Sequence, residues 1–481
     1  MLEKIRLSRD ELQLAALASL TRAKARPLPL GEAKNRGARD VRFLVVSKPM
    51  IYRATVMHTP LNPFKGGALE VIEDAGVLVR DGRIVQLEDF DVVRRAYPLE
   101  PMCDLRPGLL LPGFVDAHVH YPQVRVVGGL GMTLLDWLEH NTLPEEARLA
   151  DVTYARGVAK AFVRALLMHG TTSAMVFGAH FQGAQAALFE EAEARGLRVT
   201  SGMVFSDRLL RPELHQTPAA ALEAGQALIA QFHNKGRSRY AVMPRFALSA
   251  SEAMLEVCTE LLRVTPDAAF HTHINENDRE IQTVRDLFPW AQDYLETYER
   301  YGLVSRRAVL AHNLHASTSE LERLCAHAAS VAHCPCSNAA IGSGFFKLRA
   351  HLEHDVRFAL GTDVGGGTGY GVLKEALQAY LLQRLAPDGV MMNAAQMLYL
   401  ATKAGAEALC LEDSVGDFAV GKAFDAVWVC PREGDPLLEV YRHADSAERS
   451  LAATFALAGS ESIAEVWIGG DSVHARGLSH A

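Results

Sequence analysis

The chain has 481 residues, of which 49% are apolar and 22% are charged, and these fractions are those of globular proteins. They exclude a chain that is disordered throughout, a collagen and a long coiled coil. The 57 acidic and 49 basic residues leave a formal charge of −8, which argues against nucleic acid or a membrane surface as the partner. Seven cysteines are few and odd in number, which is typical of a reducing compartment, so we expect a cytoplasmic protein.

The first 40 residues are polar and are interrupted by several prolines and glycines. We expect residues 1–40 to form a loosely ordered N-terminal extension. Acidic residues among the bases, and the lack of an uninterrupted apolar run, argue against a signal peptide. No run of about 18 apolar residues occurs, so we expect no membrane-spanning helix.

Short β-branched runs broken by turns occupy both ends of the chain. VRFLVVSKPMIYRATVMH and AGVLVRDGRIVQLEDF lie in residues 41–111, and FDAVWVC and AEVWIGGDSVHA lie in residues 407–481. This pattern predicts antiparallel strands, with a hairpin at Asp81 and Gly82. We expect these two segments to build one smaller, composite β-sandwich domain.

Residues 112–406 follow a different rhythm, in which a short apolar run ends in polar residues and a helical stretch follows. The eight runs are LLLPGFVDAHVH, TTSAMVFGAH, GLRVTSGMVFSD, RYAVMPRFALS, DAAFHTHINEN, RAVLAHNLH, ASVAHCPCSN and VRFALGTDVGG. Such alternation predicts a parallel sheet, and eight units favour an α/β fold of the (β/α)₈ TIM-barrel type. A doubly wound open sheet is the alternative, but no G-x-G-x-x-G follows the first strand.

Histidines gather at the ends of these predicted strands, which form the catalytic face of a (β/α)₈ barrel. His118 and His120 form one His-x-His pair, and His271 and His273 form another, with Glu276 three residues beyond. Because residues i and i+2 of a strand point the same way, both rings of a pair can face the barrel interior. Each pair alone could be a coincidence, and an isolated Glu is usually a surface residue.

Two further strand ends carry His312 and Asp363. A carboxylate at a buried strand end costs several kcal/mol unless it is paired or bound to metal, although an Asp before glycines can also belong to a turn. Taken together, the strand-end residues predict a metal site with nitrogen and oxygen ligands, which suits Zn²⁺ or Fe²⁺.

Several rival motifs are incomplete. No H-E-x-x-H is present, and no Pro-Cys-x-x-Cys follows His351-Leu352-Glu353. Cys334 and Cys336 are too close for the usual zinc spacing, so we interpret them as packed thiols. GGGTGYG (365–371) lacks the Lys of a phosphate loop and is interpreted as a flexible loop over the barrel mouth.

At this point PGFVDAHVH, HTHINEN, LAHNLH and ALGTDVGGG resemble the amidohydrolase superfamily, from about residue 41 to about residue 475. Within it, the closer resemblance is to the guanine deaminase family. The segments that carry it are HVHYPQ (118–123), LLDWLEHNTLP (134–144), MPRFALS (243–249), AHCPCSNAAIGSGFF (332–346) and GTDVGGGTGYGVL (361–373).

The resemblance implies one zinc ion per subunit, with Fe²⁺ as the alternative, and a role for each matching residue. Glu276 would be the proton shuttle, Asp363 and His312 would orient the attacking water, and His271 would not be a ligand. The implied metal ligands are His118, His120, His273 and Asp363. The implied purine-binding residues are Gln123, Arg245 and Phe246, next to His120 and Glu276, with Trp137 lining the pocket or only anchoring a helix.

The implied reaction is the hydrolysis of guanine to xanthine and ammonia by a homodimeric enzyme. An arginine fork suits the O6/N7 acceptor edge of guanine, although Arg245 could instead form a structural salt bridge and Phe246 could belong to the core. The same chemistry on another purine such as 8-oxoguanine, on a pterin or on a triazine is the first alternative. A non-catalytic barrel scaffold is the second, and the complete set of ligand residues argues against it.

Overall fold

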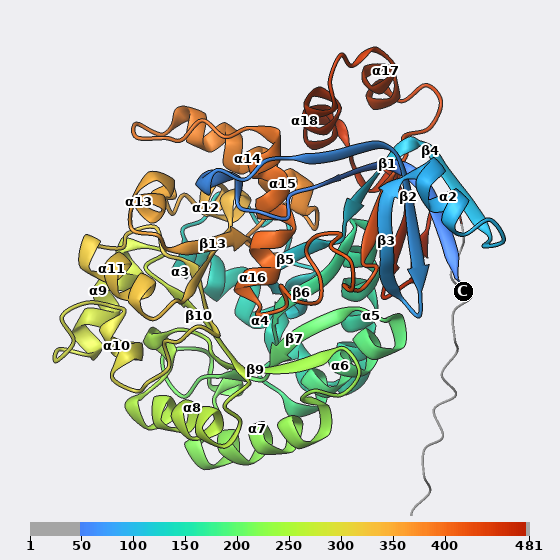
Figure 1. Ribbon diagram of the computed structural model, residues 1–481. Coiled ribbons are helices and arrows are strands. Elements are labelled where there is room, and N and C mark those ends of the chain that lie inside the picture. Colours follow the sequence, from blue (N-terminus) through green and yellow to red (C-terminus); the bar gives the residue numbers. More distant parts are fainter. Residues whose placement is uncertain (1–48, 478–481) are drawn as a thin grey trace, which may run out of the picture. The chain divides into compact units, whose positions relative to one another are not determined.

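A computed structural model describes residues 49–477 of the chain. The extension predicted for residues 1–40 lies outside the described residues, as do residues 41–48 of the first predicted strand. The described residues form a ring of parallel strands surrounded by helices, with a separate β-sheet beside it, which is a single sheet where a β-sandwich was expected (Figure 1).

The parallel strands form a nearly closed barrel, which confirms the predicted fold class. Each of the eight apolar runs contains one barrel strand, and β8 (Val204–Phe205) adds a short pairing to β9. The barrel strands are β5 (Phe114–His120), β6 (Thr171–Phe177), β7 (Arg198–Gly202), β9 (Ser238–Pro244), β10 (Ala269–Ile274), β11 (Ala308–His312), β12 (Ser330–His333) and β13 (Arg357–Leu360).

The last and first barrel strands are joined by polar contacts at their carboxyl ends. The backbone N–H of Asp363 donates to the carbonyl of His118 over 2.9 Å, and that of Thr362 donates to Asp116 Oδ1 over 3.0 Å. An open, doubly wound sheet would leave these two edges apart, so the contacts exclude that alternative.

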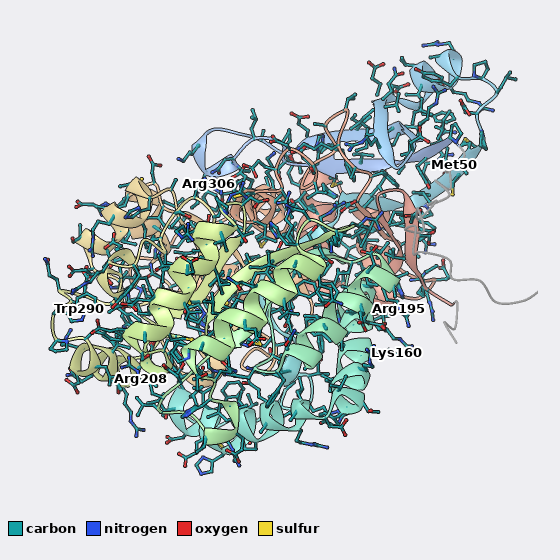
Figure 2. The ribbon with its side chains drawn as sticks, turned by 90° about the horizontal axis from the view of Figure 1, so that it is seen from below. Met50, Lys160, Arg195, Arg208, Trp290 and Arg306 are labelled. Carbon is teal, nitrogen blue, oxygen red and sulfur yellow. The ribbon has the colours of Figure 1, made fainter. Side chains whose placement is uncertain are left out.

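Helices cover the outside of the barrel because each strand is buried on both faces and needs an apolar partner there. Figure 2 shows this outer layer from below, with Lys160 and Arg195 at its edge. The main helices are α5 (Val152–Met168), α6 (Gln182–Arg195), α7 (Pro218–Phe232), α8 (Glu252–Val264), α9 (Asp278–Leu287), α11 (Thr318–Ala326), α14 (Val372–Leu385), α15 (Ala394–Ala401) and α16 (Lys403–Ala408).

Shorter helices lie in the connections. They are α3 (Leu134–Trp137), a π-helical turn (Leu138–Thr142) and α4 (Leu143–Ala147) after β5, α10 (Glu296–Glu299) after α9, and α12 (Pro335–Ile341) and α13 (Leu348–Glu353) after β12. The connection after β5 is the one that matters for the site, because its residues cover the carboxyl end of the barrel.

Strands from both ends of the chain form one seven-stranded sheet in the order β16-β15-β14-β4-β1-β2-β3. Their bounds are β1 (Met50–His58), β2 (Glu70–Arg80), β3 (Arg83–Asp89), β4 (Met102–Pro112), β14 (Ala426–Val429), β15 (Ile463–Ile468) and β16 (Asp471–Ala475). The predicted hairpin joins β2 to β3, and Asp81 and Gly82 both have positive φ (48° and 72°), as a two-residue turn of this kind requires. Helix α2 (Phe90–Ala96) packs on the sheet, and α17 (Pro436–His443) and α18 (Ala447–Leu457) lie between β14 and β15 in the chain.

The sheet and the barrel share one apolar core. Leu111 of β4 and Val427 of β14 belong to the same buried cluster as Phe114 and Val163 of the barrel. The buried carboxylate of Asp425 adds a polar contact, because it accepts hydrogen bonds from Arg198 Nη2 of β7 over 3.2 Å. The domain limits at residues 111 and 406 stay a prediction.

All seven cysteines fall within the described part of the chain and are free thiols. Among the helices of residues 49–477, none combines the length and the apolar character that a membrane crossing requires.

The barrel core predicts a strong stability effect at Phe162, which α5 buries completely against Tyr121. We expect Phe162→Ala to lower the free energy of unfolding by about 3–5 kcal/mol, because it leaves a cavity in a close-packed interior. Urea unfolding followed by circular dichroism measures the change. The control is Leu385→Ala on α14, where the side chain is 73% exposed and the expected loss is below about 0.5 kcal/mol. Equal losses in both variants would contradict the packing described here.

Candidate active site

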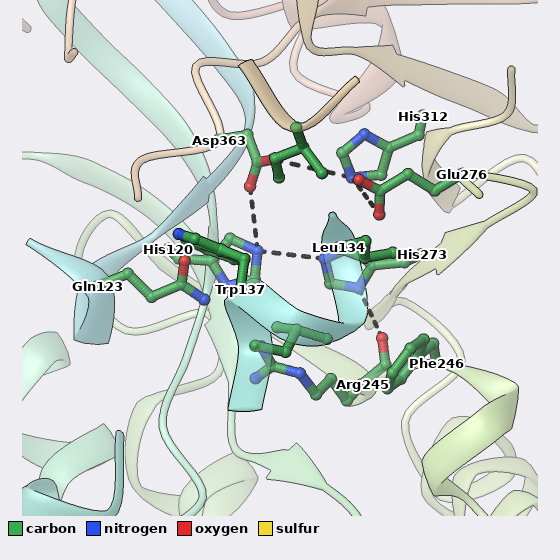
Figure 3. Close-up of a pocket in the computed structure, with 12 residues that line it drawn as sticks. His120, Gln123, Leu134, Trp137, Arg245, Phe246, His273, Glu276, His312 and Asp363 are labelled. Atoms are coloured by element: carbon green, nitrogen blue, oxygen red, sulfur yellow. Dashed lines mark hydrogen bonds and ion pairs between the residues drawn. The ribbon is translucent and has the colours of Figure 1, made fainter. Parts of the chain in front are cut away.

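The carboxyl ends of four barrel strands bring their polar side chains to one buried point (Figure 3). The Nε2 atoms of His118 and His120, both from β5, lie 3.2 Å apart. His273 Nε2, from β10, lies 3.2 Å from His120 Nε2, and Asp363 Oδ1, just after β13, lies 3.2 Å and 3.3 Å from the Nε2 atoms of His118 and His120. The strand alternation that predicted each His-x-His pair therefore places both rings of each pair inside the barrel.

Hydrogen bonds of the Nδ1 atoms, which point away from the cluster centre, determine the tautomers of His118 and His273. His271 Nδ1 donates to the carbonyl of Val309 over 2.6 Å, so its Nε2 is an acceptor and accepts a hydrogen bond from His118 Nδ1–H over 2.7 Å. His273 Nδ1 donates to the carbonyl of Arg245 over 2.6 Å. The Nε2 atoms of His118 and His273 are thus left as lone pairs directed at the centre of the cluster.

The cluster consequently brings ring nitrogens and a carboxylate within 3.2–3.3 Å of one another, and unprotonated nitrogens beside a carboxylate repel each other unless a cation is bound. Burial, above all, lowers the pKa of His118, His120 and His273 well below the ordinary value, so these rings stay neutral. Three neutral imidazoles and one carboxylate at this spacing are the donor set of a single divalent cation such as Zn²⁺. The residues fit the predicted metal.

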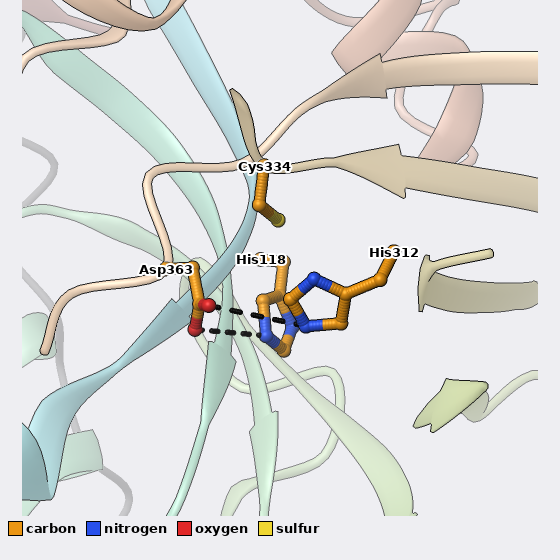
Figure 4. Close-up of side chains that lie close together, drawn as sticks. All are labelled: His118, His312, Cys334 and Asp363. Atoms are coloured by element: carbon orange, nitrogen blue, oxygen red, sulfur yellow. Dashed lines mark ion pairs between the residues drawn. The ribbon is translucent and has the colours of Figure 1, made fainter. Parts of the chain in front are cut away.

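A second grouping of ligand atoms shares two residues with the first and contains Cys334 (Figure 4). Its members are His118, His312, Cys334 and Asp363. The Cys334 thiol donates weakly to the carbonyl of Ala332, and burial raises its pKa well above the ordinary value. A neutral thiol is a poorer ligand than an imidazole lone pair, so the set with His120 and His273 is the better cation site.

Glu276 and His312 stand beside the cluster without belonging to the four-atom set. His312 Nε2 lies 3.4 Å from Glu276 Oε2 and 3.8 Å from Asp363 Oδ2, and its Nδ1 contacts Asn338 Oδ1 at 3.0 Å. Burial raises the pKa of Glu276 to about 7, with Asp363 adding to the shift and His312 opposing it. Burial lowers the pKa of His312, but the carboxylates of Glu276 and Asp363 outweigh it and leave that pKa above the ordinary value.

Local structure holds Glu276 in place. It directly precedes Asn277, the N-cap of α9, which forms a reciprocal capping pair with Glu280. The backbone N–H of Glu276 donates to Glu280 Oε2 over 3.1 Å, and Ser343 Oγ lies 3.4 Å from Glu276 Oε1. The side chain is therefore directed into the barrel mouth.

A pocket of about 350 Å³, part of which is open to solvent, borders this cluster. All sequence-predicted site residues line it except His118, which lies behind His120. The lining residues are His120, Gln123, Leu134, Trp137, Leu138, Arg245, Phe246, His273, Glu276, His312, Ile341 and Asp363. Trp137 and Phe246 are therefore wall residues of the pocket as well as buried apolar ones.

Arg245 was expected either to bind the purine or to form a structural salt bridge. It forms a salt bridge, and it also lines the pocket. Its Nη1 atom lies 2.6 Å and 2.8 Å from the two carboxylate oxygens of Glu146, on α4. Gln123 Nε2 donates to the same carboxylate over 2.9 Å. Glu146 was not predicted; the only signal was a Glu-Glu pair directly after the segment LLDWLEHNTLP.

The interpretation of residues 365–371 as a flexible loop over the barrel mouth is wrong. The start of this segment is buried and packed against the site, and so is not a loop over the open mouth. A Cβ on Gly365 would come within 3.0 Å of Gln123, and one on Gly366 within 3.2 Å of Asp363 Oδ2. Glycine is needed there because the backbone passes directly behind two site residues.

Comparison with known proteins agrees with this geometry. The model of the amidohydrolase family matches residues 109–473. A probable guanine deaminase of Deinococcus radiodurans is 57% identical over 433 residues, which cover 89% of this chain and 99% of that protein. The chain belongs to the guanine deaminase family. Within it, the solved Escherichia coli guanine deaminase is 34% identical, has a TM-score of 0.86, and matches 89% of this chain and all of its own.

A more distant structure extends the comparison beyond the family. It is an adenosine deaminase from Xanthomonas campestris, solved with bound zinc, which is 25% identical with a TM-score of 0.76 over 88% of this chain and 92% of that one. The barrel and its attached sheet are thus shared with a deaminase of a different substrate.

The two overlapping ligand groups predict different effects of single substitutions on metal content. We expect His120→Ala to lower bound zinc to below about one tenth of an ion per chain, because it removes one of four ligands. Cys334→Ala should keep about one ion per chain, because the thiol lies outside the favoured set. Metal analysis of the purified proteins measures both. Loss of zinc in Cys334→Ala, with retention in His120→Ala, would assign the ion to the Cys334 group.

Proposed function

We propose that this protein is a zinc-dependent deaminase that hydrolyses guanine to xanthine and ammonia, in purine catabolism or salvage. The observation that carries the proposal is the arrangement of one pocket. A cation site lies at its base, a buried carboxyl with a pKa of about 7 lies beside that site, and an arginine and a glutamine lie across from them. The identity to the Deinococcus radiodurans protein, over nearly the whole of its length, supports the same reaction.

The proposed zinc ligands are His118, His120, His273 and Asp363. When bound, zinc lowers the pKa of a water molecule to near neutrality and polarises the group under attack. Fe²⁺ would suit the same nitrogen and oxygen donors. His271 supports the site from outside, because it accepts the Nδ1 proton of His118.

Glu276 is the proposed general base and acid. It takes a proton from the attacking water and delivers it to N3 of guanine, which makes C2 electrophilic. It then carries the second proton of the added oxygen to the 2-amino group, so that the C2–N bond breaks, ammonia leaves and C2 becomes the carbonyl of xanthine. A pKa near neutrality suits a group that must both accept and donate a proton. His312 and Asp363 orient the water, and His312 Nε2 donates to the oxygen that develops negative charge at C2.

The opposite edge of guanine would lie against Arg245 and Gln123. Arginine N–H groups match the O6 and N7 acceptors, and the glutamine amide can pair with O6 and N1–H. Phe246 and Trp137 would bound the flat faces and the rim of the base. A deaminase of another purine, a pterin or a triazine is the alternative. Such a substrate would present a different pattern of donors and acceptors to Arg245 and Gln123.

We also propose that the protein acts as a homodimer in the cytoplasm, as the family resemblance implies. The seven free thiols suit a reducing compartment.

The substrate assignment predicts that incubation with guanine yields equal amounts of xanthine and ammonia. Chromatography of the base and an enzymatic ammonia assay measure both products. A panel containing 8-oxoguanine, adenosine, cytosine, a pterin and a triazine serves as the comparison. Faster turnover of any of these than of guanine would replace the proposed substrate.

The role of Glu276 predicts both a mutant effect and a pH effect. Glu276→Gln should lower kcat by about 10²–10⁴-fold while zinc stays bound, because the amide keeps the shape but cannot carry the proton. In the wild type, kcat/KM should fall as the pH drops through about 7 or somewhat below, because protonated Glu276 cannot accept a proton and the cation lowers its pKa further.

The exposed Glu353→Gln on α13 is the control and should keep wild-type kinetics. Steady-state rates measured from about pH 5 to pH 9 define the acidic limb. Near-normal turnover of zinc-loaded Glu276→Gln would show that the proton takes another route.

A further inference from the structure

Glu146 of α4 is a buried carboxylate that contacts both residues proposed to read the purine edge. It accepts from Arg245 Nη1 at 2.6 Å and 2.8 Å and from Gln123 Nε2 at 2.9 Å. His180 Nδ1 lies 3.4 Å from its other oxygen. All four side chains are buried, so water does not weaken these contacts.

The charges in this network are balanced. Burial raises the pKa of the Glu146 carboxyl, but the charge of Arg245, assisted by His180 and by the hydrogen bonds from Arg245 and Gln123, outweighs it and leaves the pKa below the ordinary value. Burial is the main reason that the pKa of His180 falls to about 4, so this ring is neutral at pH 7. Glu146 is therefore the anion that compensates Arg245.

The network also determines which atoms remain available to a ligand. Within residues 49–477, Gln123 Oε1 has no hydrogen-bond partner, while one Nε2 proton is used by Glu146. Arg245 Nη1 is used in the same way, so its remaining N–H groups can serve the pocket that it lines. Because a carboxylate can only accept hydrogen bonds, the side-chain amide of Gln123 cannot rotate by about 180° without losing the hydrogen bond to Glu146.

The same short segment also forms a wall of the pocket. Leu134, Trp137 and Leu138 lie 8 to 12 residues before Glu146, in α3 and the following π-helical turn, and all three line the cavity. The contacts of Glu146 thus connect this wall to two other parts of the barrel. One is the end of β9, because Arg245 directly follows that strand, and the other is the 3-10 turn Tyr121–Gln123 after β5.

We propose that Glu146 is a positioning residue that makes the pocket select a 6-oxo purine carrying N1–H over a 6-amino purine. The inference rests on the proposed function, because it assumes that a 2-amino purine binds with C2 at the cation site. In that pose Gln123 Oε1 accepts from N1–H, and the free N–H groups of Gln123 and Arg245 donate to O6. A 6-amino purine presents an acceptor at N1 and a donor at position 6, and so opposes both.

Guanine and 2,6-diaminopurine test this selection, because they share the 2-amino group and N3 and differ only at position 6 and N1. Wild-type enzyme should strongly prefer guanine. In Glu146→Gln, a neutral amide replaces the carboxylate. The side-chain amide of Gln123 can then rotate to exchange its oxygen and nitrogen, and Arg245 loses its ion pair. KM for guanine should rise by about 10- to 100-fold with kcat changed less than about fivefold, and the preference for guanine in kcat/KM should fall by at least about tenfold.

The matched control is Glu145→Gln, one residue earlier on the same helix. Glu145 is also buried, but it bonds Arg148 and Tyr154 and touches neither Gln123 nor Arg245. This variant should keep the wild-type preference. Glu146→Asp retains the charge on a shorter side chain and should recover part of the preference that Glu146→Gln loses.

The outcomes separate this inference from the proposed function. Wild-type enzyme that does not deaminate guanine overturns the proposed function itself. Wild-type activity on guanine, with Glu146→Gln slowing both bases by the same factor, overturns the role of Glu146 in selection. A variant as selective as Glu145→Gln overturns it as well. If Glu146→Gln does not fold, the same comparison is made with Glu146→Asp, where an unchanged preference and unchanged KM count against the proposal.

Discussion

The structure depends on one electrostatic constraint: the Nε2 atoms of three neutral histidine rings and the carboxylate of Asp363 converge at one buried point in the barrel mouth. His118 and His273 can direct unprotonated Nε2 atoms at the centre of the cluster because the Nδ1–H of each donates a hydrogen bond elsewhere, that of His118 to His271 and that of His273 to the carbonyl of Arg245. Such an arrangement repels itself unless a cation occupies its centre. In the proposed zinc site, these outer hydrogen bonds would hold the ligand rings in the orientation that the metal requires.

A second charge balance lies at the far side of the same pocket. Arg245 adds a positive charge close to a cation site, and Glu146 supplies the compensating negative charge from a different segment of the chain. Arg245 also links the two ends of the pocket, because its backbone carbonyl orients His273 while its guanidinium lines the cavity. In the proposed function, Arg245 would therefore connect metal binding with purine recognition.

The strand ends that build the site are conformationally unusual. His312, Asn313 and Asp363 have positive φ values of 72°, 52° and 46°. A non-glycine residue in this region costs about 1–3 kcal/mol, and such residues gather at functional sites. Here the turn aims His312 and Asp363 back over the barrel, and hydrogen bonds to Asn338 and to the backbone of His118 hold them there.

Much of this could be predicted from the sequence, because the informative patterns are local. Alternation along a strand puts His118 and His120 on one face whatever surrounds them, and the repeated strand–helix rhythm requires a parallel sheet whose carboxyl ends meet. These two facts led to the barrel and to most residues of its site. The composition alone gives 19 histidines without saying where any of them lies.

Only the tertiary structure decided which distant segments of the chain pair with one another. Glu146 meets Arg245 across 99 residues, Gly365 packs behind Gln123, and His271 supports His118 across 153 residues. Neither a Glu-Glu pair nor a run of glycines has a periodicity that reveals its partner. A hydrogen bond depends on where two side chains end in space, whereas the sequence by itself determines only which way each leaves its own strand or helix.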